Sequence, residues 1–497
     1  MRPLRLFSSA LLLLGAIPTG LGPARPVEDT QRPGLLVTVG EVTADRAALW
    51  LRADEPAPVI VRYAPAGDAA SPRRLRLEPA ARRDLTARAA LTALQPGTRY
   101  AYEVAQGPVS VKGVFATAPP ADADAPARLQ WSGDLGGGGR CRDVEDGYRI
   151  FRAMAERAPD LFLFVGDTIY ADHACGRRAH APGGDFVAST LAEYHAKHRY
   201  NRADRELQRF FRTAPVYAIW DDHEVTNDFD GPAEPLMPAG RQAFVDYWPV
   251  AGPPGEPQRL YRRVRWGRHA DIFILDTRQY RSPRATPDGP AKSMLGAAQR
   301  GWLLDGVSRS DATWKLVVSS LPLGMFTGGR ISDSWSSANV LGFPRRNGTG
   351  YVFERDHLLA AFRERGVRNL VFLTGEVHHA QLVRHEPAPG FVLHEFSAGP
   401  LSARQGYPRP MDRSLNSRSL GSLGFADNFG ELTVSGDMLE VRIVDGAGTV
   451  RVALTLPADA GALAGGMAPG RASREPRNPD AGTGGRTAAE RGSRPLR

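Results

Sequence analysis

The sequence lacks the features of a membrane-spanning or nucleic-acid-reading protein. Beyond its first 20 residues, no hydrophobic run is long enough for a transmembrane helix, so no transmembrane segment is expected. Zinc-finger patterns, aromatic-rich strand signatures and basic helices are all missing. Much of the net charge of +9 comes from arginines near the C-terminus. We therefore expect an anionic substrate and no nucleic-acid-specific binding.

Cysteine is also scarce, with only Cys141 and Cys175 in 497 residues. In an oxidising compartment, two cysteines predict one disulfide, Cys141–Cys175. The alternative is a pair of unrelated buried thiols.

The start of the chain has the pattern of a secretory leader. Arg2 and Arg5 precede an apolar run over residues 11–17 that is too short to span a bilayer as a stable helix. Gly and Pro residues follow at once, which disfavours a buried N-terminal helix. Residues 1–25 are therefore predicted to be a signal peptide, and the protein is predicted to be exported to a periplasmic or extracellular location.

Changes in sequence pattern divide the rest of the chain. Residues 33–118 contain short runs rich in β-branched and aromatic residues, broken by Asp, Pro and Gly, and they predict a small β-sandwich. A Pro/Ala/Asp linker at 119–126 follows. Over residues 127–457, continuous apolar runs alternate with helical segments, which predicts an α/β domain with strands buried on both faces. Residues 460–497 have almost no large apolar side chains and predict a disordered basic tail.

Four apolar runs of the α/β domain end directly in side chains that can bind metal ions. Because α/β domains hold their sites at the carboxyl ends of strands, we expect these side chains to meet. Each one alone has an ordinary explanation, such as a helix cap or an ion pair, but four in one order favour a metal site. The residues are Asp134; Asp167 and Tyr170; Asp221, Asp222, His223, Glu224 and Asn227; and Glu376, His378 and His379.

Such a collection of carboxylates and imidazoles suits the hydrolysis of a phosphate ester. Two clustered cations neutralise the ester and lower the pKa of a bound water, which gives a metal-activated hydroxide. A tyrosine ligand requires a strongly Lewis-acidic ion, for which Fe(III) is the best candidate. The sequence therefore predicts a dinuclear metal centre.

These motifs resemble those of the calcineurin-like metallophosphoesterase superfamily, in the group that joins alkaline phosphatase D-like phosphatases and purple acid phosphatases. Residues 133–136 (GDLG) and 166–170 (GDTIY) are similar to the first two purple acid phosphatase motifs. Residues 220–227 (WDDHEVTN) and 275–281 (LDTRQYR) are similar to alkaline phosphatase D blocks, and residues 375–379 (GEVHH) to the last metal motif.

The resemblance implies a fold as well as an activity. The expected α/β domain has four layers, α/β/β/α, and the turn at residues 94–100 resembles a fibronectin type III-like sandwich that precedes it. The first metal, Fe(3+), would bind a ligand set of the purple acid phosphatase kind, since alkaline phosphatase D usually has Cys in place of the first Asp. That set is Asp134, Asp167, Tyr170 and His378.

The resemblance leaves the second metal more open. This divalent ion (Ca, Mn, Zn or Mg) would share Asp167 and bind Glu376, together with either Asp222 or Asn227. Glu376 stands where related sequences usually have Asp or His. An oxygen-rich site of this kind favours Ca or Mn.

Other side chains are assigned supporting or catalytic roles. His223 would be the general acid for the leaving oxygen, or a hydrogen-bond donor to the phosphate. Arg140 follows a glycine-rich loop that could approach phosphate closely. His379 would line the pocket or else support the fold, and Arg278 would clamp phosphate or form an ion pair.

The sequence thus predicts an exported dinuclear-metal phosphatase or phosphodiesterase that acts on small phosphate esters. One alternative is a phospholipase D-like hydrolase of the same family with a phospholipid substrate. The other is a secreted binding protein with a degenerate phosphatase domain, which the nearly complete ligand set disfavours.

Overall fold

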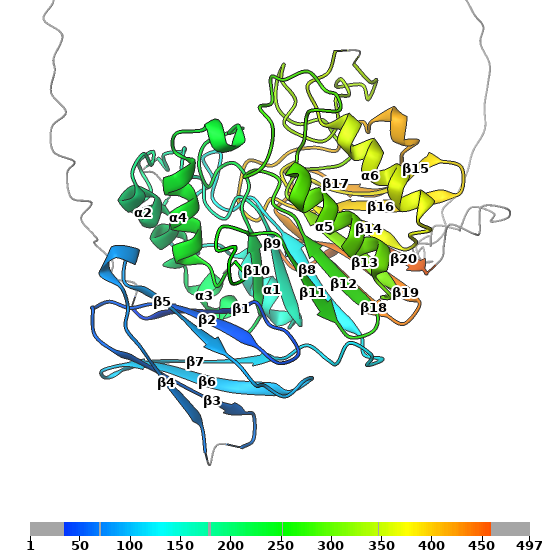
Figure 1. The fold of residues 1–497 in the computed structure, drawn as a ribbon. Coiled ribbons are helices and arrows are strands. Elements are labelled where there is room, and N and C mark those ends of the chain that lie inside the picture. The colour runs from blue at the N-terminus through cyan, green and yellow to red at the C-terminus, as the bar shows by residue number, and fades with distance from the viewer. Residues whose placement is uncertain (1–33, 69–70, 177–179, 251, 346, 459–497) are drawn as a thin grey trace, which may run out of the picture.

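Short strands, many of them buried apolar runs, form three sheets in the described structure, a computed structural model (Figure 1). The description covers residues 34–68, 71–176, 180–250, 252–345 and 347–458. The predicted signal peptide and basic tail lie outside these residues. Across the described ranges, no helix is both long and apolar enough to cross a bilayer.

The largest sheet has nine strands in the order β20-β19-β18-β8-β9-β10-β1-β2-β5. Its central strands β8, β9 and β10 run parallel, so their carboxyl ends lie at the same edge. In sheet order the nine strands are Val450–Pro457, Met438–Asp445, Asn428–Ser435, Ala127–Ser132, Leu161–Val165, Val216–Ile219, Leu36–Gly40, Ala47–Arg52 and Thr86–Leu91.

A second sheet has seven strands in the order β11-β12-β13-β14-β16-β15-β17. Strands β12, β13, β14 and β16 are parallel to one another. In sheet order the seven strands are Arg262–Trp266, Ala270–Ile274, Trp314–Ser319, Leu370–Thr374, Phe391–Ser397, Ala380–Ala388 and Arg418–Leu423.

Alternate residues of β13 separate two hydrophobic cores. Leu316 and Val318 belong to a large core that also contains Leu163 and Val165 of β9, so the two sheets pack face to face. Val317, between them, belongs to a second core that includes side chains of α5 and α6. These two helices therefore cover the other face of the seven-stranded sheet, as Figure 1 shows.

Helices also cover the outer face of the nine-stranded sheet. Phe162 of β9 packs edge-on against Phe210 of α3, and Phe164 packs edge-on against Trp248, which follows α4. The helices are α1 (Ile150–Glu156), α2 (Leu191–Arg202), α3 (Arg205–Phe211), α4 (Met237–Tyr247), α5 (Gly296–Arg309) and α6 (Val352–Glu364), with short 3₁₀ turns at Ala81–Arg83, Gly231–Ala233 and Arg413–Leu415.

The N-terminal β unit is continuous with the α/β region. Strands β1, β2 and β5 extend the nine-stranded sheet through a parallel bridge between Gly40 and Val216. Buried Trp50 of β2 donates its indole N–H to the carbonyl of Asp246 at 2.7 Å, which ties the unit to the end of α4. The remaining strands form a separate sheet, β4-β3-β6-β7, that comprises Arg73–Leu77, Val59–Pro65, Arg99–Gln106 and Val109–Ala116.

Cys141 and Cys175 form the predicted disulfide, with their Cα atoms 5.9 Å apart. The bond joins the loop that follows β8 to the loop that follows β9. Because Asp134 and Asp167 lie on these same loops, the disulfide links the two segments that carry the first two predicted metal ligands.

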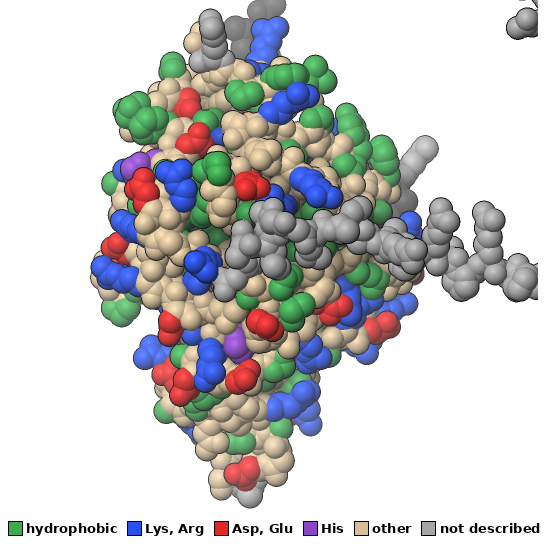
Figure 2. Space-filling model, turned by 90° about the vertical axis from the view of Figure 1, so that its right-hand side faces the viewer, with side chains coloured by type: hydrophobic (Ala, Val, Ile, Leu, Met, Phe, Trp, Pro, Cys, Tyr) green, Lys and Arg blue, Asp and Glu red, His purple; other side chains and the backbone are tan. Residues whose placement is uncertain are grey.

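Charges of both signs share the molecular surface. On the face shown in Figure 2, Lys and Arg side chains are interspersed with Asp and Glu side chains. The positive charge on this face is therefore spread out instead of being gathered into one patch.

Candidate metal centre

The predicted ligands follow the strand ends of both sheets. Asp134 and Asp167 come two residues after β8 and β9, and Glu376 comes two residues after β14. A glycine precedes each of them, and at Gly375 a Cβ atom would lie 2.9 Å from the carbonyl oxygen of Val165 in the facing sheet. The close approach of the two sheets thus explains why a glycine stands before the acidic residue in this motif.

Four predicted ligands have a left-handed backbone conformation. The φ angles are 62° at Asp134, 51° at Asp167, 68° at Glu376 and 56° at His378. This region is rare for residues with a Cβ atom, and such strain concentrates at functional sites, where the surrounding structure enforces it. The fold therefore holds these side chains in positions that an unstrained turn would not give.

The predicted iron ligands lie side by side. Ligand atoms of Asp134, Asp167 and His378 lie within 4.8 Å of one another. The Tyr170 hydroxyl is 3.1 Å from His378 Nε2, which in turn is 3.5 Å from Asp134 Oδ1. The structure thus brings together all four residues of the first predicted set.

A second group adjoins the first through Asp167. Ligand atoms of Asp167, Asp222 and His223 lie within 4.8 Å of one another, as do those of Asp221, Asp222 and Glu376. Asp222 is therefore common to both groups and links Asp167 to Glu376.

The electrostatics of this cluster favour the binding of positive charge. Burial, reinforced by the neighbouring carboxylates, raises the pKa values of Asp134, Asp167 and Glu376 well above their usual range. Oδ2 of Asp134 and Oδ2 of Asp167 are buried without a hydrogen-bond partner. Unpaired buried carboxylate oxygens are costly unless a cation binds them, so the donor set fits metal ions.

His378 has the protonation state of a metal ligand. Burial lowers the pKa of its imidazole to about 4, so the ring is neutral at pH 7. Its Nδ1–H donates to the carbonyl oxygen of Arg404 at 2.5 Å, which leaves the lone pair of Nε2 directed at Asp134 and Tyr170. A hydrogen bond of this kind fixes the tautomer of a ligating histidine.

His223 lies over the cluster in a different state. Its ring stacks on Tyr170 with centroids 4.0 Å apart, and its Nδ1 is 2.7 Å from Asp172 Oδ1. Although burial favours the neutral ring, the carboxylates of Asp222 and Asp172 raise the pKa of His223 to about 9. Asp172 was not among the predicted residues, although it lies only two positions after Tyr170.

Glu224 and Arg278 support the cluster through hydrogen bonds and ion pairs to its neighbouring segments. Glu224 accepts hydrogen bonds from the backbone N–H groups of Thr168 and Asp221, at 2.6 and 2.8 Å. Buried Arg278 is 2.6 Å from Asp221 and 2.8 Å from Asp333. The ion-pair alternative for Arg278 is therefore the one that the structure has, and sequence reasoning missed its partner Asp333.

Three predicted residues make their described hydrogen bonds with residues outside the predicted ligand set. Asn227 is exposed, and its backbone N–H donates to Asp172. His379 uses Nδ1 with the carbonyl of Val377 and Nε2 with Gln381, so it supports the fold of its own turn.

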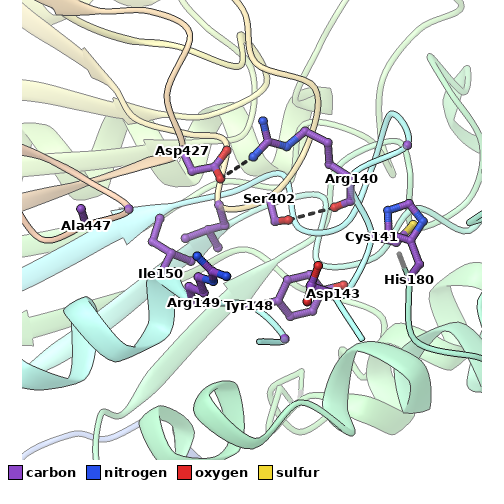
Figure 3. A pocket seen from close by; sticks show the side chains of 14 residues that line it. Arg140, Cys141, Asp143, Tyr148, Arg149, Ile150, His180, Ser402, Asp427 and Ala447 are labelled. Carbon is purple, nitrogen blue, oxygen red and sulfur yellow. Dashed lines mark hydrogen bonds and ion pairs between the residues drawn. The ribbon is translucent and has the colours of Figure 1, made fainter. Parts of the chain in front are cut away.

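Arg140 is the third residue whose described contact lies outside the predicted ligand set. Its guanidinium binds Asp427 at 2.7 Å, on the wall of a neighbouring cavity of about 590 Å³ (Figure 3). Arg140 is therefore paired with a carboxylate in this arrangement, and its side chain is 42% exposed.

The chain matches the model of a known protein family. The model of the PhoD-like phosphatase family matches residues 139–442, which is more than half of the chain. The chain belongs to the PhoD-like phosphatase family. The matched range contains Asp167, Asp222, Glu376 and His378, and Asp134 precedes it.

Relatives of this PhoD-like protein have the same type of fold. Alkaline phosphatase D of Bacillus subtilis (strain 168) is 26% identical over 276 residues, which span 48% of this chain and 44% of that protein. The match thus covers less than half the length of that relative. A solved structure of PhoD superposes with a TM-score of 0.71 at 19% identity, covering 85% of this chain and 90% of that one. Purple acid phosphatase PPD1 from yellow lupin (Lupinus luteus) gives 0.58 at 13% identity, with coverages of 85% and 74%. The chain therefore has a metallophosphoesterase-like α/β fold.

Proposed function

We propose that this protein hydrolyses phosphate esters at a dinuclear metal centre, as a phosphomonoesterase or phosphodiesterase. The observation that carries the proposal is the convergence of a buried, partly unpaired carboxylate set with one neutral imidazole and one phenol. Fe(3+) would be held by Asp134, Asp167, Tyr170 and His378.

A divalent ion would lie next to the iron. It would share Asp167 and bind Asp222 and Glu376. We choose Asp222 over Asn227 because Asp222 lies within the cluster while Asn227 is exposed. Ca, Mn, Zn and Mg remain the candidates for this oxygen-rich set.

His223, positioned by Asp172 and Tyr170, would protonate the leaving oxygen. When bound, the two cations neutralise the ester and lower the pKa of water. Asp172 holds Nδ1 of His223, so Nε2 is the nitrogen available to place a proton on the leaving oxygen. The stacked ring of Tyr170 keeps the His223 imidazole in place over the cluster.

The wider architecture belongs to the same proposal. We assign residues 127–457, with the paired sheets that they build, to a four-layer α/β/β/α arrangement, and residues 33–118 to a fibronectin type III-like unit whose strands β1, β2 and β5 extend the nine-stranded sheet. The Cys141–Cys175 disulfide supports export, because such bonds persist in oxidising compartments.

A Tyr170→Phe variant tests the iron site directly. We expect purified protein to contain iron and a second metal, to hydrolyse nitrophenyl phosphate, and to show a visible tyrosinate-to-iron charge-transfer band. The variant should lose this band because the phenolate is its source. Tyr200→Phe is the matched control, since Tyr200 is also a buried tyrosine but donates to the carbonyl of Arg142. A parent protein that is inert toward nitrophenyl phosphate and bis-nitrophenyl phosphate, or that holds neither metal, would refute the proposal.

An Asp172→Asn variant tests the role of His223. Asn cannot supply the negative charge that orients the protonated imidazole, so we expect kcat on an alkyl phosphate to fall about 10- to 100-fold. The loss on nitrophenyl phosphate should be much smaller, because nitrophenolate leaves without protonation. His173→Ala is the control, since His173 contacts the same Asp172 oxygen at 3.0 Å but is partly exposed. Equal losses on both substrates would show that Asp172 is only structural.

A further inference from the structure

Two large aromatic side chains are stacked on the surface beside the metal centre. Tyr407 is 58% exposed and Phe425 is 73% exposed. Their ring centroids are 6.0 Å apart and their planes differ by 25°, so the rings form one continuous aromatic surface. Together, the two side chains form what we call the aromatic pair.

The loop of Tyr407 is fastened to the metal ligand His378. Nδ1 of His378 donates to the carbonyl of Arg404 at 2.5 Å, and the N–H of Gly406 donates to the carbonyl of His378 at 2.6 Å. A Cβ atom at Gly406 would lie 2.9 Å from the carbonyl oxygen of Val377, so only glycine allows this close approach. The position of Tyr407 is thereby coupled to that of a metal ligand.

The loop of Phe425 is fastened to the first. The N–H of Phe425 donates to the carbonyl of Gly406 at 2.8 Å. Asp427 accepts from the side chain of Gln405 at 2.8 Å and from Arg140 at 2.7 Å; Figure 3 shows the second of these bonds. The aromatic pair is thus held on a rigid base that also contacts the glycine-rich loop after β8.

Solvent reaches the ligand that is bonded to this loop. The side chain of His378 is 22% exposed, whereas that of Asp134 is 1% exposed. The loop of Tyr407 is therefore bonded to a part of the centre that is open to solvent.

The backbone of Phe425 is unusual for an exposed residue. Its φ angle is 55°, in the region that disfavours side chains with a Cβ atom. The ring is mostly exposed, so little burial offsets this strain. Backbone strain that burial of the side chain does not offset is typical of a ligand-binding position.

We infer that the aromatic pair binds a planar aromatic group on the alcohol side of the phosphate ester, by stacking. This inference rests on the proposed function and names the substrate class for the same site. An exposed, preorganised ring pair suits flat π systems such as an aryl group or a nucleobase, and it offers no enclosed channel for a flexible chain.

The experiment compares KM values for four phosphate monoesters in the full-length, metal-loaded protein. Two substrates carry planar groups, 1-naphthyl phosphate and a nucleoside monophosphate, and two do not, glycerol 3-phosphate and a long-chain alkyl phosphate. The double variant Tyr407→Ala/Phe425→Gly removes both rings, and glycine also accepts the positive φ. Phe353→Ala is the matched control, because Phe353 is 47% exposed but lies on α6.

We expect the double variant to raise the KM ratio of the planar esters to glycerol 3-phosphate about tenfold, as the loss of a stacking contact predicts. Phe353→Ala should keep the parent ratio. A shift for only one of the two planar esters would narrow the class to nucleosides or to simple aryl groups. An unchanged ratio, or an equal rise for the long-chain alkyl ester, would overturn the inference. If the parent hydrolyses none of the four esters, the proposed function fails instead, so the two failures are distinguishable.

Discussion

Replacing Asp167 with Asn is expected to lower kcat/KM for phosphate esters by at least about 10³-fold, through loss of the residue shared by both proposed metal sites. A bound cation contributes several kcal/mol of transition-state stabilisation, and about 1.4 kcal/mol corresponds to each tenfold change in rate. An amide oxygen cannot bridge two cations as a carboxylate does. Metal analysis of the purified variant should show the loss of at least one ion.

The same substitution should not unfold the protein. Asp167 is 1% exposed and lies among other buried carboxylates, so its removal relieves repulsion in the metal-free state. We therefore expect the metal-free variant to be at least as stable as the metal-free parent in thermal unfolding. Asp305→Asn is the control for a solvent-exposed carboxylate, whose side chain is 59% exposed, and it should retain full activity. Activity within tenfold of the parent, with both metals retained, would remove Asp167 from the centre.

How far the sequence predicts this centre depends on whether each signal is local. Asp134, Asp167 and Glu376 each follow a glycine at the end of an apolar run, and such a pattern needs only a few neighbouring residues to be recognised. The disulfide is equally easy to predict, because two cysteines allow one pairing. Local patterns of this kind give the candidate ligands and the strands that carry them.

Residues that act through distant partners were harder to predict. Arg278 and Asp333 lie 55 positions apart, so the sequence leaves open whether Arg278 clamps phosphate or forms an ion pair. The parallel bridge from Gly40 to Val216 joins two strands that are far apart in the sequence. The sequence pattern does not reveal this pairing, so it predicts an N-terminal unit that is separate from the α/β region. Long-range pairing of this kind depends on the packing of the whole fold.

The neighbours His378 and His379 show a different limit. Both are imidazoles in one motif, yet His378 points into the cluster while His379 bonds Val377 and Gln381. The φ angle of 56° at His378 turns the backbone between them. Sequence type cannot distinguish the two rings, because a strained backbone at one residue decides which ring reaches the cluster.

Replacing Arg278 with Met is expected to destabilise the protein by about 3–5 kcal/mol, the largest stability effect of a single substitution that we predict. The side chain is fully buried, 2.6 Å from Asp221, 2.8 Å from Asp333 and 3.6 Å from Asp222. Burial lowers the pKa of Arg278, but these carboxylates together outweigh burial and raise that pKa well above its usual value. Met fills much of the same volume but leaves buried Asp221 without its ion-pair partner, whereas Asp333 keeps its ion pair with Arg281 at 3.0 Å. A buried charge without its partner is far costlier than an exposed one.

Thermal and denaturant unfolding of metal-free protein would measure this loss. Arg365→Met is the matched control, because the Arg365–Asp305 pair is 3.6 Å long with side chains 45% and 59% exposed, and such exposed pairs contribute less than about 1 kcal/mol. Divalent cations should stabilise Arg278→Met more than they stabilise the parent, since a cation at Asp222 restores part of the missing positive charge. A loss no larger than that of the control, or equal stabilisation of both proteins by metal, would show that Arg278 does not neutralise the proposed metal centre.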